Sequence, residues 1–211
     1  MKTPVMMIIN PAAGRGGYKK NLPEALKMLS DAGCAVSVFF TERRGHATEL
    51  AAEYGAGFEK LLVLGGDGTL AEAIAGLMSM EIRPQVGYIP IGTANDIART
   101  VGLTKNDILE GVRRFLKGEP RAFDTGRRDG GYFNYVAAFG AFTEVSYGTP
   151  QEFKKQLGEA AYLIGAAKSL SKLKSRHVRV EYDGGELDGE DGGAHSDISF
   201  ENCPRAIRLI C

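Results

Sequence analysis

The sequence predicts an α/β domain, in which helices cover both faces of a parallel β-sheet, followed by an incomplete C-terminal β-sandwich domain. Three observations lead to this fold class. Apolar runs alternate with helical patterns up to about residue 120, glycine-rich loops follow three of those runs, and the pattern changes after Gly118. Near-continuous apolar strands are typical of a parallel sheet that is buried on both faces. We therefore expect one domain over residues 1–120 and a second over 121–211.

Strands and helices are expected to alternate along the first domain. The expected strands are the apolar runs 5–9, 36–40, 61–64 and 86–89. The expected helices have apolar residues at helical spacing or are rich in alanine, and they cover residues 22–30, 46–54, 70–78, 95–100 and 105–117.

The second domain is expected to begin with a β-hairpin. Residues 121–127 and 132–142 are extended and aromatic, and the Asp-Gly-Gly sequence at 129–131 is a turn signal between them. A long helix over 151–174 and a strand over 178–182 follow. Seven basic and three acidic residues give the segment 151–182 a net charge of +4. A basic amphipathic helix can lie on anionic lipid, and a solvated helix that packs on the second domain is the other interpretation.

The last part of the chain has a different composition. Residues 184–193 contain five glycines and four acids, and nothing from Gly192 onward reads as a completed domain. We therefore expect a truncated or frame-shifted product, with a non-native tail from about residue 190.

Composition excludes several classes of protein. Lys and Arg total 26 and Asp and Glu total 26, so no basic field indicates a partner nucleic acid. Three cysteines without a paired motif favour reduced thiols over a disulfide scaffold. No apolar segment approaches the 18 residues that a spanning helix needs, so we expect a cytoplasmic protein.

Glycine is abundant, at 28 residues, and much of it lies in three loops that each follow an expected strand. These loops are residues 10–17, 65–69 and 90–96. In an open parallel sheet such loops form the ligand crevice, and glycine lets the backbone approach a phosphate. The chain contains no GxxxxGK[ST] motif, and the strand after Gly66 and Gly68 ends without the acid that a Rossmann dinucleotide site needs.

Carboxylates accompany the glycines. Asp67 and Asp96 lie within two of the loops, and Asp124 lies in a later expected strand. An acid beside a phosphate is unfavourable unless a divalent cation lies between them, and Mg²⁺ binds one or two carboxylates together with phosphate oxygens. The alternatives are a helix cap or turn for Asp96 and a surface turn for Asp124.

Together the motifs resemble those of a known family. Asn10-Pro-Ala-Ala-Gly14, Gly65-Gly-Asp-Gly-Thr69 and Gly92-Thr-Ala-Asn-Asp96 stand in the order and spacing of the diacylglycerol-kinase-like lipid kinases, in particular their soluble bacterial branch. The resemblance covers about residues 5–183. Gly-Gly-Asp-Gly-Thr is shared with NAD kinases and, more distantly, phosphofructokinases, whereas the Gly-Thr-x-Asn-Asp block distinguishes the lipid kinases from both.

The resemblance implies an NAD-kinase/diacylglycerol-kinase-like fold that binds ATP and Mg²⁺ and transfers the γ-phosphate to a lipid hydroxyl, such as that of diacylglycerol. It implies catalytic roles for Asp67, Asp96 and Asp124, with Asp67 and Asp124 at the metal. It also implies an ATP site that is lined by Asn10, Pro11, Ala12, Ala13, Gly14, Thr41, Gly66, Asp67, Gly68, Thr69, Leu70, Ala71, Glu72, Thr93 and Asn95.

One departure keeps alternatives open. The family's later Asp-Asp-Gly segment, which supplies the general base, is not found after Asp183. An NAD kinase and a non-catalytic nucleotide-binding remnant therefore remain as alternative interpretations. The expected partners are a membrane lipid substrate and the inner face of the membrane, through peripheral contact, and a homodimer is left open.

Overall fold

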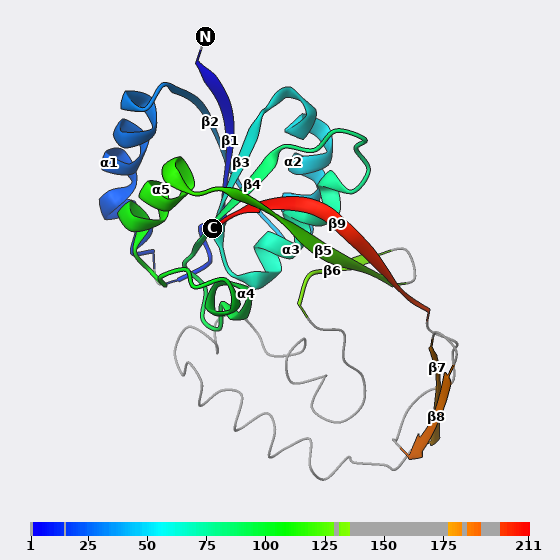
Figure 1. Ribbon diagram of the computed structural model, residues 1–211. Helices are drawn as coiled ribbons and strands as arrows, with labels where there is room; N and C mark the ends of the chain where they lie inside the picture. The colour runs from blue at the N-terminus through cyan, green and yellow to red at the C-terminus, as the bar shows by residue number, and fades with distance from the viewer. Residues whose placement is uncertain (1, 15, 129–130, 136–176, 183–184, 191–198) are drawn as a thin grey trace. The chain divides into compact units, whose positions relative to one another are not determined.

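The computed structural model describes residues 2–14, 16–128, 131–135, 177–182, 185–190 and 199–211 (Figure 1). Contacts divide the chain into two units. One comprises Met1–Tyr135 with Ser199–Cys211, and the other Val136–Ile198. The described part of the second unit is an antiparallel hairpin of β7 (His177–Tyr182) and β8 (Gly185–Glu190). The strand expected at 178–182 is thus present, and part of the glycine-rich acidic run forms its partner.

The first unit is built on a seven-stranded sheet in the order β2-β1-β3-β4-β9-β5-β6. The first four strands in this order are parallel. Their bounds are Thr3–Ile9 for β1, Cys34–Phe40 for β2, Lys60–Gly65 for β3 and Gln85–Pro90 for β4. The expected parallel α/β sheet is therefore confirmed.

Helices cover both faces of this sheet, as Figure 1 shows. One face carries α1 (Tyr18–Asp31) and α5 (Ile108–Lys117), and the other carries α2 (His46–Tyr54), α3 (Asp67–Leu77) and α4 (Asp96–Thr100). A short 3₁₀ helix, Gly55–Gly57, follows α2. Strand residues alternate between the two cores: Val5, Met7 and Ile9 pack with α1 and α5, whereas Met6 and Ile8 pack with α2 and α3.

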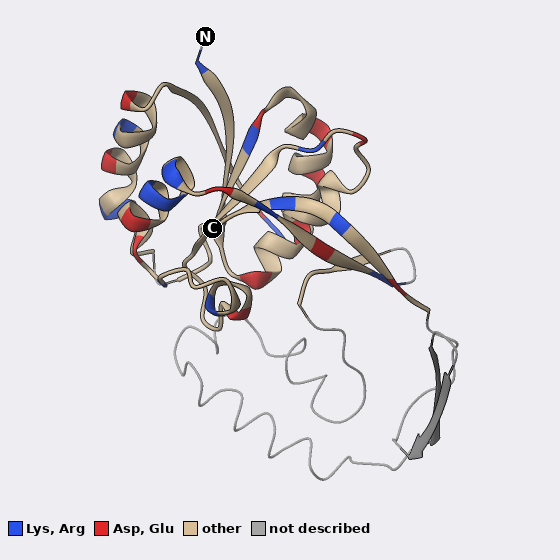
Figure 2. Cartoon of the chain, in the orientation of Figure 1, with Lys and Arg blue, Asp and Glu red and all other residues tan. Residues whose placement is uncertain are grey.

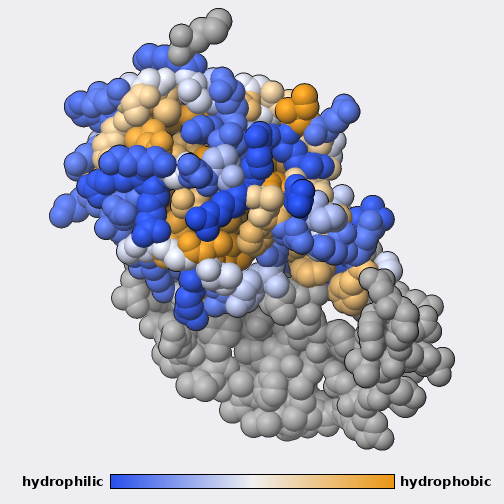
Figure 3. All heavy atoms as spheres, viewed as in Figure 1, coloured by the Kyte–Doolittle hydropathy of each residue, from blue (hydrophilic) through white to orange (hydrophobic). Residues whose placement is uncertain are grey.

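Charged residues lie on the helices and are absent from two strands in the middle of the sheet. Figure 2 shows acidic and basic residues on the helices, whereas β1 and β4 carry none. On the face drawn in Figure 3, hydrophilic residues cover much of the described surface, with apolar patches between them. Charged residues stay in water because transfer of an unpaired charge to the sheet core is costly.

Two helices begin earlier than the apolar spacing predicts. α1 begins at Tyr18 rather than at residue 22, and α3 begins at Asp67 rather than at residue 70. The spacing rule fails here because the first turn of each helix is polar or glycine-containing and carries little periodic apolar signal. The consequence matters for α3, since the glycine loop leads directly into its first turn.

The start of α5 has a recognisable cap. The Asp107 side chain accepts a hydrogen bond from the backbone N–H of Glu110 at 2.9 Å, and Glu110 pairs with Arg113 and Arg114. Such a cap satisfies one of the unpaired N–H groups at a helix N-terminus. It explains why α5 begins at Ile108, a little later than the expected residue 105.

The expected hairpin at the start of the second domain belongs to the first unit. β5 (Pro120–Arg128) pairs antiparallel with β6 (Gly131–Phe133), so the main division falls after residue 135 rather than near 120. The extended stretch expected beyond residue 135 and the helix expected over 151–174 lie outside the described residues.

The C-terminal residues form a strand that the sequence analysis did not predict. β9 (Phe200–Ile210) lies inside the sheet, parallel to β4 and antiparallel to β5. Ile207, Leu209 and Ile210 are buried in the two cores. The sequence hides this strand because a proline and charged residues interrupt its apolar pattern, and the strand is stabilised by neighbours far away along the chain.

Candidate functional site

Three loops meet at the carboxyl ends of β1, β3 and β4. They comprise residues 10–17, 65–66 and 91–95. Because the three strands are parallel neighbours, their carboxyl ends lie along one edge of the sheet. The sequence predicted this grouping.

Asn10 joins the first loop to the start of α3. Its Nδ2 donates to Thr69 Oγ1 at 2.9 Å, and its Oδ1 accepts from the Ala12 N–H at 2.9 Å. Its own backbone N–H donates to the Leu64 carbonyl at 2.9 Å. The Asn10 side chain therefore fixes the first loop to itself and to α3, and the Asn10 backbone ties it to β3.

Glycine is required where the loops approach one another. A Cβ on Gly92 would lie 2.5 Å from the Gly66 Cα, and a Cβ on Gly14 would lie 2.1 Å from the Ile91 carbonyl oxygen. Gly14 also has φ +50, in the left-handed region that favours glycine. The loops thus meet backbone to backbone, with no room for a side chain at either contact.

Asp67, the first residue of α3, reaches across to α4. Its two carboxylate oxygens accept the backbone N–H groups of Asp96 and Ile97, at 3.0 and 3.2 Å. The carboxylate thus accepts hydrogen bonds from two N–H groups at the start of α4, and each oxygen keeps a further lone pair. Asp96 lies at the same place and pairs with Arg99 at 3.6 Å. The structure therefore brings Asp67 and Asp96 together.

Asn95 sets the shape of the third loop. It is buried in the left-handed conformation, with φ 56. Its Oδ1 accepts from the Gly92 N–H at 3.0 Å and from the Tyr88 hydroxyl at 3.1 Å, and its Nδ2 donates to the Gly92 carbonyl at 2.7 Å. Burial raises the pKa of Tyr88, and the charges of Asp67 and Asp96 raise it further, so the hydroxyl stays a donor.

Lys105 is a residue that the sequence analysis did not single out. Its Nζ donates to the Thr93 carbonyl, and the next residue, Asn106, donates its backbone N–H to the Pro90 carbonyl at 2.9 Å. The loop after α4 therefore places a flexible ammonium beside the third glycine loop. The position of Lys105 relative to the Gly92–Asp96 motif along the sequence does not indicate this contact with Thr93.

The other expected site residues differ in exposure. Pro11, Ala12, Gly14, Gly68 and Thr93 are exposed, Ala13, Gly66, Ala71 and Glu72 are half-buried, and Thr41, Thr69 and Leu70 are buried. The Leu70 side chain packs in the core, so only its backbone can face a ligand. Thr41 follows β2, and its backbone N–H donates to the Ile9 carbonyl at 2.9 Å.

Asp124 lies on β5, and its contacts are on β9. Oδ1 accepts from the Arg205 N–H at 2.8 Å and Oδ2 from Asn202 Nδ2 at 3.1 Å. The Arg205 N–H lowers the pKa of the Asp124 carboxyl most, followed by the Asn202 amide. Within the described residues, no hydrogen bond joins Asp124 to Asp67 or Asp96.

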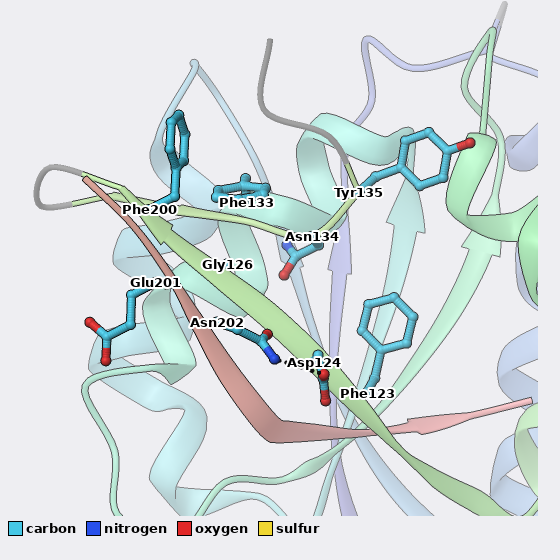
Figure 4. Close-up of a pocket in the computed structure, with 9 residues that line it drawn as sticks. All are labelled: Phe123, Asp124, Gly126, Phe133, Asn134, Tyr135, Phe200, Glu201 and Asn202. Carbon is cyan, nitrogen blue, oxygen red and sulfur yellow. Dashed lines mark hydrogen bonds between the residues drawn. The ribbon is translucent and has the colours of Figure 1, made fainter. Parts of the chain in front are cut away.

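A hollow of about 470 Å³ lies beside Asp124 (Figure 4). Its lining includes the aromatic side chains of Phe123, Phe133 and Tyr135. Asn134 also lines it, and its Oδ1 accepts from Thr125 Oγ1 at 3.1 Å. Buried Asn134 Nδ2 has no hydrogen-bond partner among the residues that the structure describes.

A family model, the diacylglycerol kinase catalytic domain, matches residues 4–128. Similar proteins include the diacylglycerol kinase of Bacillus subtilis, 37% identical over 185 residues, which are 87% of this chain and 61% of that protein. The diacylglycerol kinase of Staphylococcus aureus strain bovine RF122 / ET3-1 is 37% identical over 191 residues, or 90% and 60% of the two chains.

A solved structure gives the same result. A crystal structure of a diacylglycerol kinase from Bacillus anthracis superposes with a TM-score of 0.71 at 30% identity, over 89% of this chain and 61% of the other. The chain thus spans about 60% of the length of the relatives it matches. In the described part of the chain, no helix is both long and apolar enough to cross a membrane.

Proposed function

Since the chain belongs to the diacylglycerol kinase catalytic domain family, we propose that its three glycine loops bind ATP with Mg²⁺ for transfer of the γ-phosphate to a lipid hydroxyl. The single observation that carries this proposal is the meeting of the loops at Gly14, Gly66 and Gly92. Backbone N–H groups and the N-terminus of α3 are suited to an anionic phosphate chain.

The donor set fits a nucleotide-bound Mg²⁺. The described residues hold no cluster of three or more His, Cys, Asp and Glu for a metal ion. A nucleotide-bound Mg²⁺ does not need one, because it takes one or two carboxylates, phosphate oxygens and water. Asp67 would be the carboxylate that faces it, held in place by α4, with Asp96 beside it. The ion would supply neutralisation of phosphate charge.

The residues of this chain would then position and balance charge. Asn10 and Asn95 fix the loops, and the Lys105 ammonium adds a positive charge near Thr93. Phosphoryl transfer depends mainly on such positioning and electrostatic stabilisation. The bond from the γ-phosphorus to its bridging oxygen breaks, a bond to the lipid oxygen forms, and the hydroxyl proton passes to a base.

The proposed acceptor is a lipid hydroxyl. The relatives are named diacylglycerol kinases, and by that likeness we propose a diacylglycerol-type lipid as acceptor. Such a lipid lies in a membrane, so the protein would work from the cytoplasm, in peripheral contact with the membrane's inner face.

Transfer of radiolabel from γ-labelled ATP tests the proposal. The chain is incubated with Mg²⁺ and mixed vesicles that contain diacylglycerol, and in parallel with sphingosine or NAD. We expect label in diacylglycerol, and a loss of at least about tenfold in the Asp67→Asn variant, as for other changes at a metal site. Glu24→Gln, an exposed change on α1, is the control. Label in NAD alone, or ATP binding with no labelled product, would contradict the proposal.

A further inference from the structure

Strand β2 forms one edge of the seven-stranded sheet, and among the described strands it pairs with β1 alone. The Gly33 carbonyl, just before β2, accepts from the Thr3 N–H at 3.0 Å, and the Thr41 N–H, just after it, donates to the Ile9 carbonyl at 2.9 Å. Because the main chain of a strand turns alternate residues to opposite edges, the odd-numbered residues of β2 face β1. The even-numbered residues turn their N–H and C=O groups to the open edge. These residues are Cys34, Val36, Val38 and Phe40.

The sequence of β2 does not protect this edge. The strand reads Cys-Ala-Val-Ser-Val-Phe-Phe, seven residues without a charge, a proline or a glycine. Natural sheets protect free edges with charged residues, proline, bulges or very short strands, because unpaired backbone groups otherwise pair with another strand. The opposite edge of the same sheet is of the protected kind, since β6 is only three residues long. β2 is therefore the edge that is suited to a further strand.

We propose that the chain forms a two-fold symmetric dimer in which β2 of one copy pairs antiparallel with β2 of a second copy. A second copy fits because the edge is complementary to itself. A two-fold axis at Ser37 sets Val36 opposite Val38 of the second copy, and Cys34 opposite Phe40 of the second copy. In this register the outward-facing residues of the two strands meet and exchange N–H···O=C bonds, as an isologous interface requires.

The same register matches side chains and charges. Exposed Ala35 comes opposite Phe39 of the second copy, so a small residue faces a large one. Just outside the strands, exposed Asp31 lies at the level of exposed Arg43 of the second copy, so unlike charges meet at both ends of the interface. Such pairs fix the register of an interface more than they add affinity. Phe40, which is 47% exposed in the single chain, would be covered at the same ends.

Cysteine cross-linking tests the register. In Ser37→Cys the two introduced thiols would face each other across the axis, at the Cα separation of about 4.5 Å of a non-hydrogen-bonded antiparallel pair, which a disulfide can span. Ala35→Cys is the matched control. It is exposed on the same face of β2, but its two copies would lie four residues apart along the strands, about 14 Å. We expect mild oxidation to link Ser37→Cys into a covalent dimer and to leave Ala35→Cys unlinked, with the native cysteines the same in both.

Sedimentation velocity measures the association itself. We expect the unaltered chain to sediment as a dimer at about 100 μM, well above a micromolar Kd. Ser37→Lys should weaken self-association at least about tenfold, because two like charges would stand opposite each other at the axis. Ile82→Lys, at a position 85% exposed between α3 and β4, adds the same charge away from β2 and should leave the dimer intact. An unchanged thermal midpoint shows that each variant is folded.

Three results would overturn the inference. They are a monomer at about 100 μM, a dimer that Ser37→Lys does not weaken, and equal cross-linking of Ser37→Cys and Ala35→Cys. A dimer that Ile82→Lys disrupts instead would mean that another surface joins the copies. None of these measurements needs a nucleotide, so they decide on the β2 interface whether or not the chain binds Mg²⁺·ATP.

Discussion

At the scale of single residues, glycines in the loops serve two different ends. Gly14 and Gly92 are needed by the fold, since a Cβ at either would overlap backbone atoms of a neighbouring loop. Gly68, in the first turn of α3, has open space around its missing Cβ. No contact in the folded chain requires glycine at this position, so we propose that Gly68 keeps the N-terminus of α3 accessible to the phosphates of ATP.

The variant Gly68→Ala tests this distinction. We expect the free energy of unfolding to stay level or to rise by up to about 0.5–1 kcal/mol, because alanine is the better helix former. ATP affinity should fall, since the methyl group would lie at the N-terminus of α3, where we propose that the phosphates bind. Unfolding curves and calorimetric titration measure the two quantities. Gly57→Ala, at a position that also has open space, is the control, and its free energy of unfolding and its ATP affinity should both stay unchanged. Full ATP affinity in Gly68→Ala would mean that the phosphates bind elsewhere.

Lys105 allows a second test at this scale. Replacing it with methionine removes a positive charge beside Thr93 and leaves the backbone contact of Asn106 in place. We expect ATP affinity to fall by about three- to tenfold at low salt, with less effect on adenosine, because screening weakens such interactions as salt rises. Lys27→Met, on the exposed side of α1, is the matched control. An equal loss for adenosine would argue against a charge effect.

Tyr88 gives a prediction in pH. Its pKa is raised in the folded chain, so the hydroxyl stays neutral there while an unfolded tyrosine ionises above about pH 10. The stabilisation due to Tyr88 is therefore complete below about pH 10 and is lost as the pH rises further. Tyr88→Phe, which removes the hydrogen bond to Asn95, should cost about 1 kcal/mol at pH 7. The difference in free energy of unfolding between the two proteins should shrink above about pH 10; a constant difference would contradict the assignment.

At the scale of elements, sequence and structure agree best where the signal is local. The apolar strands and the glycine loops follow from runs and motifs a few residues long. Asp67 shows how far such local signals reach. Its place in a glycine loop was expected, but its bonds to the start of α4 join residues 29 and 30 positions apart and could not be predicted. Strand β9 could not be predicted from local signals at all. Its partners β4 and β5 lie far back along the chain, and its own pattern is broken by Pro204, Arg205 and Arg208.

The place of β9 in the core leads to a stability prediction. Ile207 is 2% exposed and packs in the core on the α2 and α3 face. Ile207→Ala should lower the free energy of unfolding by about 2–5 kcal/mol, as for other large-to-small changes in a core. Arg208→Ala, an exposed neighbour on the same strand, should have little effect. Equal denaturation midpoints for both variants would mean that β9 does not hold this position in solution.

At the scale of the whole molecule, the sheet connects the two ends of the described chain. The loops that form the candidate nucleotide site follow β1, β3 and β4, and β9 lies in the same sheet between β4 and β5. Arg83 joins the Ala206 carbonyl of β9 to the C-terminus of α3, the helix whose N-terminus carries Asp67. The C-terminal strand is thus hydrogen-bonded, through Arg83, to the helix that carries a candidate site residue.

The central claim, that the three loops together bind Mg²⁺·ATP, is tested most directly by hydrogen exchange of the whole chain with and without that ligand. We predict slower exchange at residues 10–17, 65–70 and 91–96, with little change at β5 and β9. Protection that is absent from these loops, or that is found instead around the hollow beside Asp124, would contradict the account.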